Sequence, residues 1–226
     1  MYATANPDTN LQIRWLGHSC FHIRLGAASI ITDPAPPKTG YDILPMAADI
    51  VTVSHDHWDH NYLPLVTGEP RVFNRAGKFN FKDINISGLP SFHDGEQGKT
   101  RGKNLIFRME AQGLSIAHMG DLGDFPAPEV MEQLIGLDVL LIPVGGIFTI
   151  DADAAYELSG KLKPKMIIPM HFKTKDLTFK LDPVEKFILK FPRVQKIPYL
   201  NYINRVDDEP AVVVLDYLLT RTRGEG

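Results

Sequence analysis

Short apolar runs separated by turns dominate the first half of the chain. Each run spans about three to seven residues, a length that is typical of strands and too short for helices. Proline, glycine and polar residues interrupt the runs, as in PAPPKTG at 34–40. The pattern predicts strands at 11–16, 20–25, 28–32, 49–55, 71–73, 84–88, 104–110 and 114–118. We therefore expect this half to be mostly β-sheet.

The pattern changes near residue 128, where helical and strand-like segments begin to alternate. Helices are predicted at 128–137, 151–162 and 183–191, and strands at 138–144 and 165–170. These two strands are almost continuously apolar, as expected when both faces of a sheet are covered. The alternation predicts an α/β arrangement in which helices cover the sheets.

Length and local composition indicate a single domain. The chain has 226 residues, a length that suits one domain, and its sequence contains no low-complexity tract and no repeat of 20–50 residues. We expect one domain over 1–226, with polar, flexible ends at 1–10 and 221–226. The most loop-like interior stretch, GEQGKTRGK at 95–103, is either a mobile flap or a long hairpin turn.

Composition and charge exclude several classes of protein. Apolar residues make up 44% and charged residues 23%, unlike a disordered or fibrous chain. The net charge of −3 provides no field for nucleic acid, and Cys20 alone can form neither an internal disulfide nor a thiolate metal cage. The sequence has neither a leader pattern nor 18 consecutive apolar residues. We expect a cytoplasmic protein without nucleic-acid partners or membrane insertion. The composition is also compatible with a homo-oligomer.

Residues 55–60, HDHWDH, contain three histidines and two aspartates directly after the apolar segment DIVTVS. Neutral imidazole and carboxylate are the ligands that suit zinc and related divalent ions. A chain that turns after a strand can direct positions 55, 57, 59 and 60 at one point, whereas a helix would place 57 on the face opposite 55 and 59. A His-rich surface loop is the alternative interpretation.

The order His-x-His-x-Asp-His after an apolar strand resembles the signature of the metallo-β-lactamase superfamily of binuclear metal hydrolases. His93, Asp121 and His171 follow in chain order, each just past a predicted strand. The segments WLGHSCFHIRLG and IITDP resemble the subgroup that includes ascorbate-6-phosphate lactonase and N-acyl phosphatidylethanolamine phospholipase D, and the resemblance extends over residues 11–175. It implies an α/β (α+β) fold, a four-layer αββα sandwich of two mixed β-sheets flanked by helices.

The resemblance also implies a ligand set for two divalent metal ions, with zinc expected and manganese or iron as alternatives. One ion would be held by His55, His57 and His93, the other by Asp59, His60 and His171, and Asp121 would bridge them. A metal-bound hydroxide would then cleave an ester, lactone or phosphodiester bond in a small substrate, with Asp59 also acting catalytically on the proton. The alternatives are a phosphodiesterase or nuclease acting on nucleotide or RNA ends, and a metal-dependent sensor without turnover.

Further polar residues are candidates for supporting the ligands or binding substrate. His18 and Asp33 are as compatible with a structural role as with a role beside the metals. His118 is in phase with Leu114 and Ile116 on a strand, which favours the core or a place behind the ligands. Arg101 and Asn104 match the RG-x-N pattern of the subgroup. Five cations could contact an anionic group, or they could simply be solvated: Lys99, Arg101, Lys103, Lys173 and Lys175.

Overall fold

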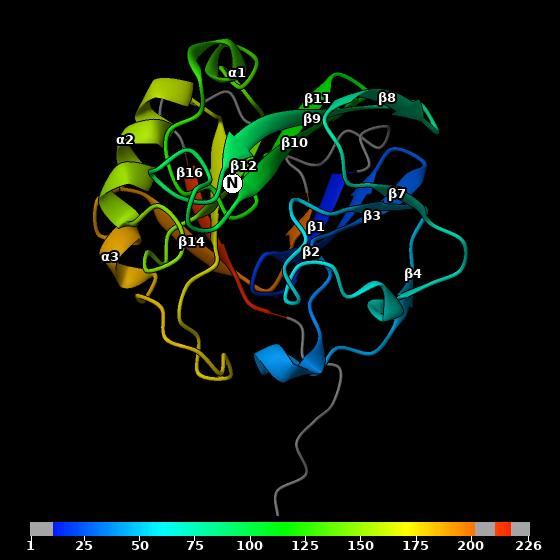
Figure 1. The fold of residues 1–226 in the computed structure, drawn as a ribbon, viewed down its shortest axis with the longest axis horizontal. Coiled ribbons are helices and arrows are strands. Elements are labelled where there is room, and N and C mark those ends of the chain that lie inside the picture. Colours follow the sequence, from blue (N-terminus) through cyan, green and yellow to red (C-terminus); the bar gives the residue numbers. More distant parts are fainter. Residues whose placement is uncertain (1–10, 202–210, 218–226) are drawn as a thin grey trace, which may run out of the picture.

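Two mixed β-sheets pack face to face in the computed structural model, which describes residues 11–201 and 211–217 (Figure 1). The α/β fold class with two mixed sheets is therefore confirmed. The ends predicted to be flexible, 1–10 and 221–226, lie outside the described residues. Among the described residues, no helix combines the length and apolar character needed to cross a membrane.

The first sheet has the strand order β15-β1-β2-β3-β5-β7. Strands β1 to β3 are antiparallel, and β3, β5 and β7 run parallel. In β1 the buried Leu11, Ile13 and Trp15 alternate with half-buried Gln12 and Arg14, the period expected of a strand with one face in the core. The strands are β1 (Leu11–Gly17), β2 (Cys20–Leu25), β3 (Ala28–Thr32), β5 (Ile50–Thr52), β7 (Arg71–Phe73) and β15 (Leu200–Asn201).

The second sheet has the order β14-β16-β13-β12-β11-β10-β9-β8. Its strands β8 to β11 are antiparallel, and β11 to β13 with β14 and β16 run parallel. Its members are β8 (Gly77–Phe81), β9 (Ile84–Phe92), β10 (Lys103–Ala111), β11 (Leu114–His118), β12 (Val139–Pro143), β13 (Met166–Met170), β14 (Val194–Ile197) and β16 (Ala211–Leu215). Every residue of β12 and β13 is buried, as their apolar sequences predicted.

Three helices cover the outer face of this second sheet: α1 (Pro128–Glu132), α2 (Ala152–Leu162) and α3 (Glu185–Ile188). The carboxylate of Asp151 caps α2 by accepting hydrogen bonds from the backbone N–H groups of Asp153 and Ala154. The helices predicted at 128–137 and 183–191 are shorter than expected. Past Ile188 the chain continues in tighter turns, since the N–H groups of Lys190 and Phe191 donate to carbonyls three residues back, and Gly136 takes a left-handed φ of +73° in the turn before β12.

The outer face of the first sheet has no α-helix among the described residues. Loops take the place of that helical layer, and they contain the 3-10 turns η1 (Pro37–Thr39) and η2 (Leu63–Leu65) and the two-stranded sheet of β4 (Met46–Ala47) and β6 (Val66–Thr67). Leu16 and Ile31 on the sheet pack there against Tyr41 and Leu65. The helices thus flank only one of the two sheets.

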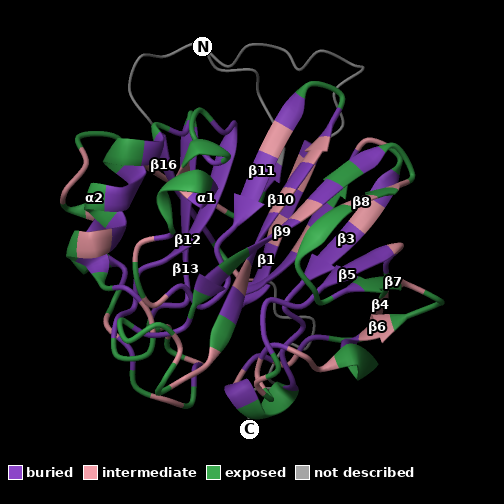
Figure 2. Ribbon diagram, turned by 45° about the horizontal axis from the view of Figure 1, so that its top comes forward, coloured by how far each residue is buried: buried purple, intermediate pink, exposed green. Residues whose placement is uncertain are grey.

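A continuous buried cluster joins the inner faces of both sheets (Figure 2). It includes Ile13 and Phe21 of the first sheet together with Ile86, Phe107 and Ile116 of the second. The two sheets thus share one core among the described residues. The chain segments that leave strands β3, β5, β9, β11 and β13 carry the polar residues described next.

Candidate metal centre

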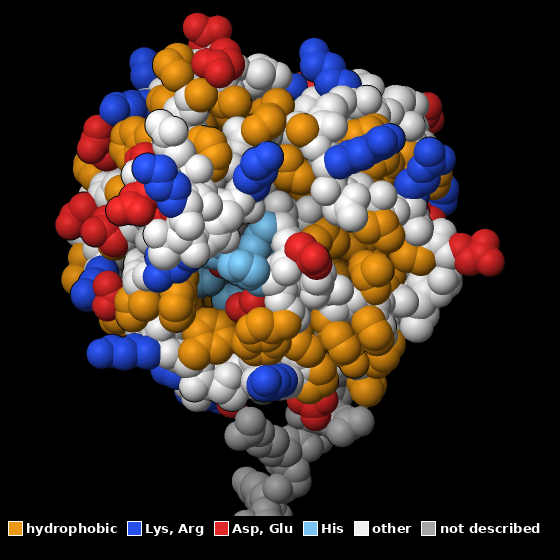
Figure 3. Space-filling model, viewed as in Figure 1, with side chains coloured by type: hydrophobic (Ala, Val, Ile, Leu, Met, Phe, Trp, Pro, Cys, Tyr) orange, Lys and Arg blue, Asp and Glu red, His pale blue; other side chains and the backbone are white. Residues whose placement is uncertain are grey.

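Histidine side chains gather at the floor of a hollow in the surface (Figure 3). One carboxylate oxygen lies at their centre. Oδ2 of Asp121 is 3.2 Å from Nε2 of His60, 3.3 Å from Nε2 of His171, 3.4 Å from Nε2 of His93 and 4.0 Å from Nε2 of His55. Four imidazoles from three loops therefore surround a single carboxylate oxygen, and both Asp121 and these histidines are buried.

Two groups of potential ligands consist of histidines alone, and a third joins Asp33 to His55 and His60. The nitrogen atoms of His55, His57 and His93 lie within 4.8 Å of one another, as do those of His18, His60 and His171. Ligands bound to one zinc ion at 2.0–2.2 Å lie roughly 3.3 Å apart, close to the separations around Asp121. The donor set of imidazole and carboxylate therefore fits a divalent cation on each side of Asp121.

The structure brings together all the residues for which the sequence predicted metal binding. Nδ1 of His57 is 3.1 Å from Nε2 of His55, and Oδ2 of Asp59 is 3.9 Å from Nε2 of His60. The side chain of Asp59 is 16% exposed and that of Asp121 only 4%. Of these two carboxylates, Asp59 is thus the more accessible to a substrate in the hollow.

His60 is held from behind by Asp33, at the end of β3. Burial lowers the pKa of His60, but Asp121 and Asp33 outweigh burial and raise the pKa well above its ordinary value. Burial would raise the pKa of Asp121, yet His171 and His60 hold it well below its ordinary value. Asp121 and Asp33 thus favour a proton on His60, and a cation that binds Nε2 has to displace that proton.

A short hydrogen-bond chain fixes the orientation of His55. Oγ of Ser54 donates to Oδ2 of Asp33 at 2.5 Å, and it accepts from Nδ1 of His55 at 2.9 Å. This arrangement leaves Nε2 of His55 unprotonated and facing the cluster. Burial lowers the pKa of His55 to about 3, so the ring is neutral and ready to bind a cation. Sequence analysis missed Ser54, although it directly precedes the motif.

His18 lies in the β1–β2 connection, in contact with the cluster. Its Nε2 is 3.2 Å from Oδ2 of Asp59, and its carbonyl accepts the backbone N–H of His171 at 3.1 Å. Burial lowers the pKa of His18 to about 4, so the neutral ring donates to the Asp59 carboxylate. His18 therefore holds Asp59 in place. The sequence alone had left a structural role for His18 equally open.

His118 lies behind the site with both ring nitrogens engaged by backbone groups. Its Nε2 is 2.8 Å from the carbonyl of Ser19, and its Nδ1 accepts the N–H of Gly120 at 3.2 Å. Asn104 supports the same turn, since its Oδ1 accepts the N–H of Asp121 at 3.0 Å. Both residues therefore position the segment that carries Asp121.

The segment predicted as a flap or hairpin turn connects the antiparallel strands β9 and β10. The carboxylate of Asp94 organises it by accepting backbone N–H groups of Glu96, Gly98, Thr100 and Arg101 at 2.6–3.0 Å. These bonds, led by that from Arg101, lower the pKa of Asp94 to about 2. Sequence analysis did not single out Asp94, whose position directly after His93 was the available signal.

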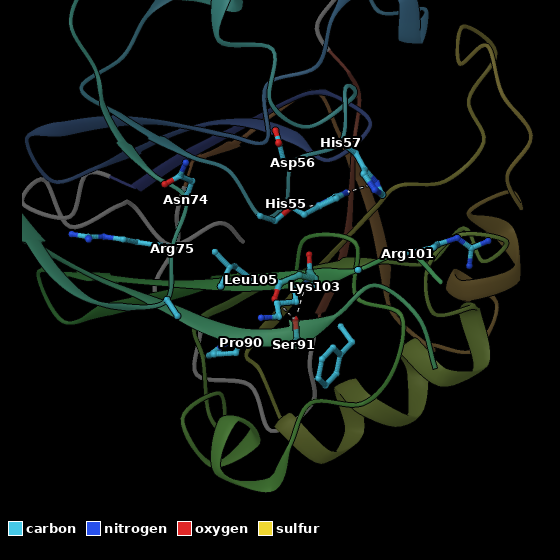
Figure 4. Close-up of a pocket in the computed structure, with 15 residues that line it drawn as sticks. His55, Asp56, His57, Asn74, Arg75, Pro90, Ser91, Arg101, Lys103 and Leu105 are labelled. Carbon is cyan, nitrogen blue, oxygen red and sulfur yellow. Dashed lines mark hydrogen bonds between the residues drawn. The ribbon is translucent and has the colours of Figure 1, made fainter. Parts of the chain in front are cut away.

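Two cavities meet at this hollow. The metal cavity, of about 460 Å³, is lined by candidate ligands and by Trp58, Arg101, Phe148 and Phe179. The adjoining groove, of about 740 Å³, runs from His57 and Arg101 past Lys103 to Arg75 (Figure 4). Both are within the size range of small-molecule sites.

Comparison with known proteins finds relatives along most of the chain. A family profile described as a beta-lactamase superfamily domain matches residues 12–171. A protein of Thermotoga maritima, whose structure is assigned to the Zn-dependent hydrolases of the metallo-beta-lactamase superfamily, is 37% identical with a TM-score of 0.77, covering 91% of this chain and 98% of its own. UPF0173 metal-dependent hydrolases of Lawsonia intracellularis and Thermoplasma acidophilum are 31% and 29% identical, covering 92% and 79% of this chain and 96% and 89% of their own.

Proposed function

The chain belongs to the beta-lactamase superfamily as a metal-dependent hydrolase, and we propose that it uses two divalent cations, zinc by preference, to cleave an ester, lactone or phosphodiester bond in a small molecule. One observation carries the proposal: Oδ2 of Asp121 is within 4.0 Å of Nε2 atoms from both groups of histidines. A carboxylate in that position suits a ligand shared between two neighbouring cations.

In this proposal His55, His57 and His93 hold one cation, and Asp59, His60 and His171 hold the other. Bound cations would supply a water molecule of lowered pKa and would polarise the oxygen of the scissile bond. Hydrogen bonds from His18 and Ser19 orient Asp59 and Asp121. Oδ2 of Asp59, more exposed than Asp121, is placed to hold the proton that passes to the leaving group.

The test combines metal analysis with a substrate panel of lactones, carboxylic esters and phosphodiesters. We expect two equivalents of metal, loss of turnover with a chelator, and recovery with zinc or manganese. His57→Ala and Asp121→Ala should each reduce turnover by about two orders of magnitude or more and lower the metal content. His22→Ala, a partly buried histidine on β2 outside the cluster, is the matched control.

Two outcomes would contradict the proposal. A metal content of one equivalent or less after saturation would exclude the binuclear site. Metal-dependent ligand binding without product across the panel would instead indicate a sensor.

We also propose a cytoplasmic location and a small-molecule partner, supported by the single buried Cys20 and the two cavities.

A further inference from the structure

Among the cationic side chains near the hollow, only Arg101 lines both cavities. Lys103 lines the adjoining groove alone, and Lys99 and Lys175 line neither cavity. Lys173 is already engaged, because its Nζ donates to the carbonyls of Leu177 and Phe179. Of these five cations, Arg101 is therefore the one that lines the metal cavity itself.

Arg101 is held at its backbone by its own loop and at its side chain by the loop that follows β12. Its backbone N–H donates to Asp94 at 2.6 Å, and its Nη2 donates to the carbonyl of Ile147 at 3.1 Å. Its guanidinium carbon lies 5.3 Å from the centre of the Phe148 ring. Figure 4 shows Arg101 at one end of the adjoining groove, its side chain directed away from Arg75 at the other end.

Ile147 contributes to this arrangement through a backbone conformation that a β-branched residue rarely adopts. Its φ is +62°, in the left-handed region that normally favours glycine. Strained residues of this kind cluster at ligand sites, where the surrounding structure enforces them. The strain here directs the carbonyl of Ile147 at the guanidinium and so fixes the position of the positive charge.

No carboxylate of the described residues forms an ion pair with Arg101. A guanidinium carries five N–H donors, and the structure shows Ile147 accepting from one side-chain nitrogen. The planar fork of the group matches a carboxylate or a phosphate with two parallel hydrogen bonds. The free side of Arg101 thus has the chemistry of an anion receptor.

Aromatic side chains form the rest of the metal cavity's wall. Trp58 is 48% exposed and Phe148 37% exposed, although both are large enough to be costly to leave in water. Phe148 and Phe179 pack edge to face with ring centres 6.3 Å apart. Such a wall fits an apolar, preferably aromatic, part of a ligand.

We propose that Arg101 anchors a carboxylate or phosphate group of the substrate while the aromatic wall holds an apolar part next to the cleaved bond. The substrate class is therefore an anionic aromatic ester, lactone or phosphodiester. This inference rests on the proposed function for the bond that is cleaved. Arg101 should also bind an anion when no bond is cleaved, so the anchor can be tested by binding alone.

The kinetic test compares matched substrates in the metal-loaded protein. Phenyl hemisuccinate and phenyl butyrate differ in one carboxylate, and an acyl chain ending in a phosphate provides the second anion. Arg101→Met should reduce kcat/KM for the anionic esters about 10- to 100-fold, mainly through KM, and leave phenyl butyrate nearly unchanged. Arg101→Lys should recover part of the loss, because it restores the charge without the planar fork. Lys99→Met, in the same loop, is the control and should match the wild type.

The binding test separates this inference from the proposed function. Benzoate, phenyl phosphate and benzyl alcohol are titrated against the metal-loaded protein while Trp fluorescence is followed. Weaker binding of both anions to Arg101→Met, with unchanged metal content and unchanged benzyl alcohol binding, supports the anchor even if no ester is cleaved. Weaker binding of only one of the two anions to Arg101→Met would assign the anchor to that anion. Equal binding of all three probes by wild type and Arg101→Met would overturn it, even if esters are hydrolysed.

Discussion

Oδ2 of Asp33 lies 2.9 Å from Nδ1 of His60, on the side of the ring that faces away from Asp121. The same buried carboxylate accepts the N–H of Ser54 at 2.8 Å and the Ser54 hydroxyl, which in turn holds His55. Asp33 thus orients a histidine of each candidate metal group, one directly and one through Ser54. Such partners behind metal ligands set the ring orientation and raise ligand basicity.

Asp33→Asn should therefore weaken metal binding without removing a ligand. Both oxygens of Asp33 accept hydrogen bonds, whereas asparagine has one acceptor oxygen, so either His60 Nδ1 and the Ser54 hydroxyl or the Ser54 N–H loses its acceptor. We expect zinc affinity to fall about 10- to 100-fold, as measured by competition with a chromogenic chelator. The matched control is Asp138→Asn, which alters another buried carboxylate, paired with Ser115 and Lys165 away from the site. Equal zinc affinity in wild type and Asp33→Asn would contradict this role.

His93 and His118 should behave differently when each is replaced by alanine. His93 directs Nε2 at Asp121, so His93→Ala should lose about one equivalent of metal. His118 uses both nitrogens on the backbone of Ser19 and Gly120, so His118→Ala should keep its metal but lose about 1–3 kcal/mol of unfolding free energy. Metal analysis and urea denaturation distinguish the two. If His118→Ala loses metal as His93→Ala does, the assignment of His93 is wrong.

The fold could be predicted from the sequence wherever one segment carried its own signal. The buried strands β12 and β13 are continuous apolar runs, and β1 to β3 lie where their patterns placed them. Strand β8 escaped prediction because its residues GKFNF are half-buried or exposed and are held mainly by pairing with β9. Strand β16, AVVVL, was overlooked although its apolar run is plain, and its place between β13 and β14 depends on pairing across the chain.

The candidate ligands could be predicted because the motif at 55–60 resembles the metallo-β-lactamase signature, and His93, Asp121 and His171 follow it in the family's order, each just past a strand. His18, Asp33, His118, Arg101 and Asn104 were also named as candidates, but the contacts through which they act could not be predicted, since these contacts join distant parts of the chain. Asn104 meets Asp121 through its side chain, and Arg101 meets Ile147 only because the β9–β10 connection approaches the loop after β12. Hydrogen bonds of this kind leave no periodic pattern in the sequence.

Gly145 and Gly160 offer a paired test of packing next to the site. A Cβ on Gly145 would lie 2.0 Å from the carbonyl oxygen of His171, whereas a Cβ on Gly160, exposed in α2, would meet nothing within 4 Å. Gly145→Ala should cost about 1–3 kcal/mol and displace His171, lowering zinc affinity. Gly160→Ala should stabilise the protein by about 0.5–1 kcal/mol with zinc affinity unchanged. Denaturant titration checks both, and a neutral Gly145→Ala would show that the two loops are not packed as described.

The metal-free protein should lose stability in acid because of its buried neutral histidines. Burial lowers the pKa of His18 to about 4 and that of His55 to about 3, from an ordinary 6.5. Below pH 6.5 the unfolded chain binds protons that these folded sites exclude, so the free energy of unfolding falls as the pH drops towards about 3. His60 has the opposite sign: its raised pKa stabilises the fold fully below 6.5, and this stabilisation is lost as the pH rises through the folded value.

Thermal unfolding with excess chelator, scanned from about pH 8 to about pH 4.5, should therefore show the highest melting temperature near the ordinary histidine pKa, with a decline on the acid side. His55→Gln removes one of the groups responsible and should flatten the acid side of that profile, whereas Lys99→Met, an exposed change in the β9–β10 connection, should leave it as in the wild type. A melting temperature that rises steadily towards acid would mean that His18 and His55 bind protons in the folded state, and would contradict the lowered pKa of these two rings.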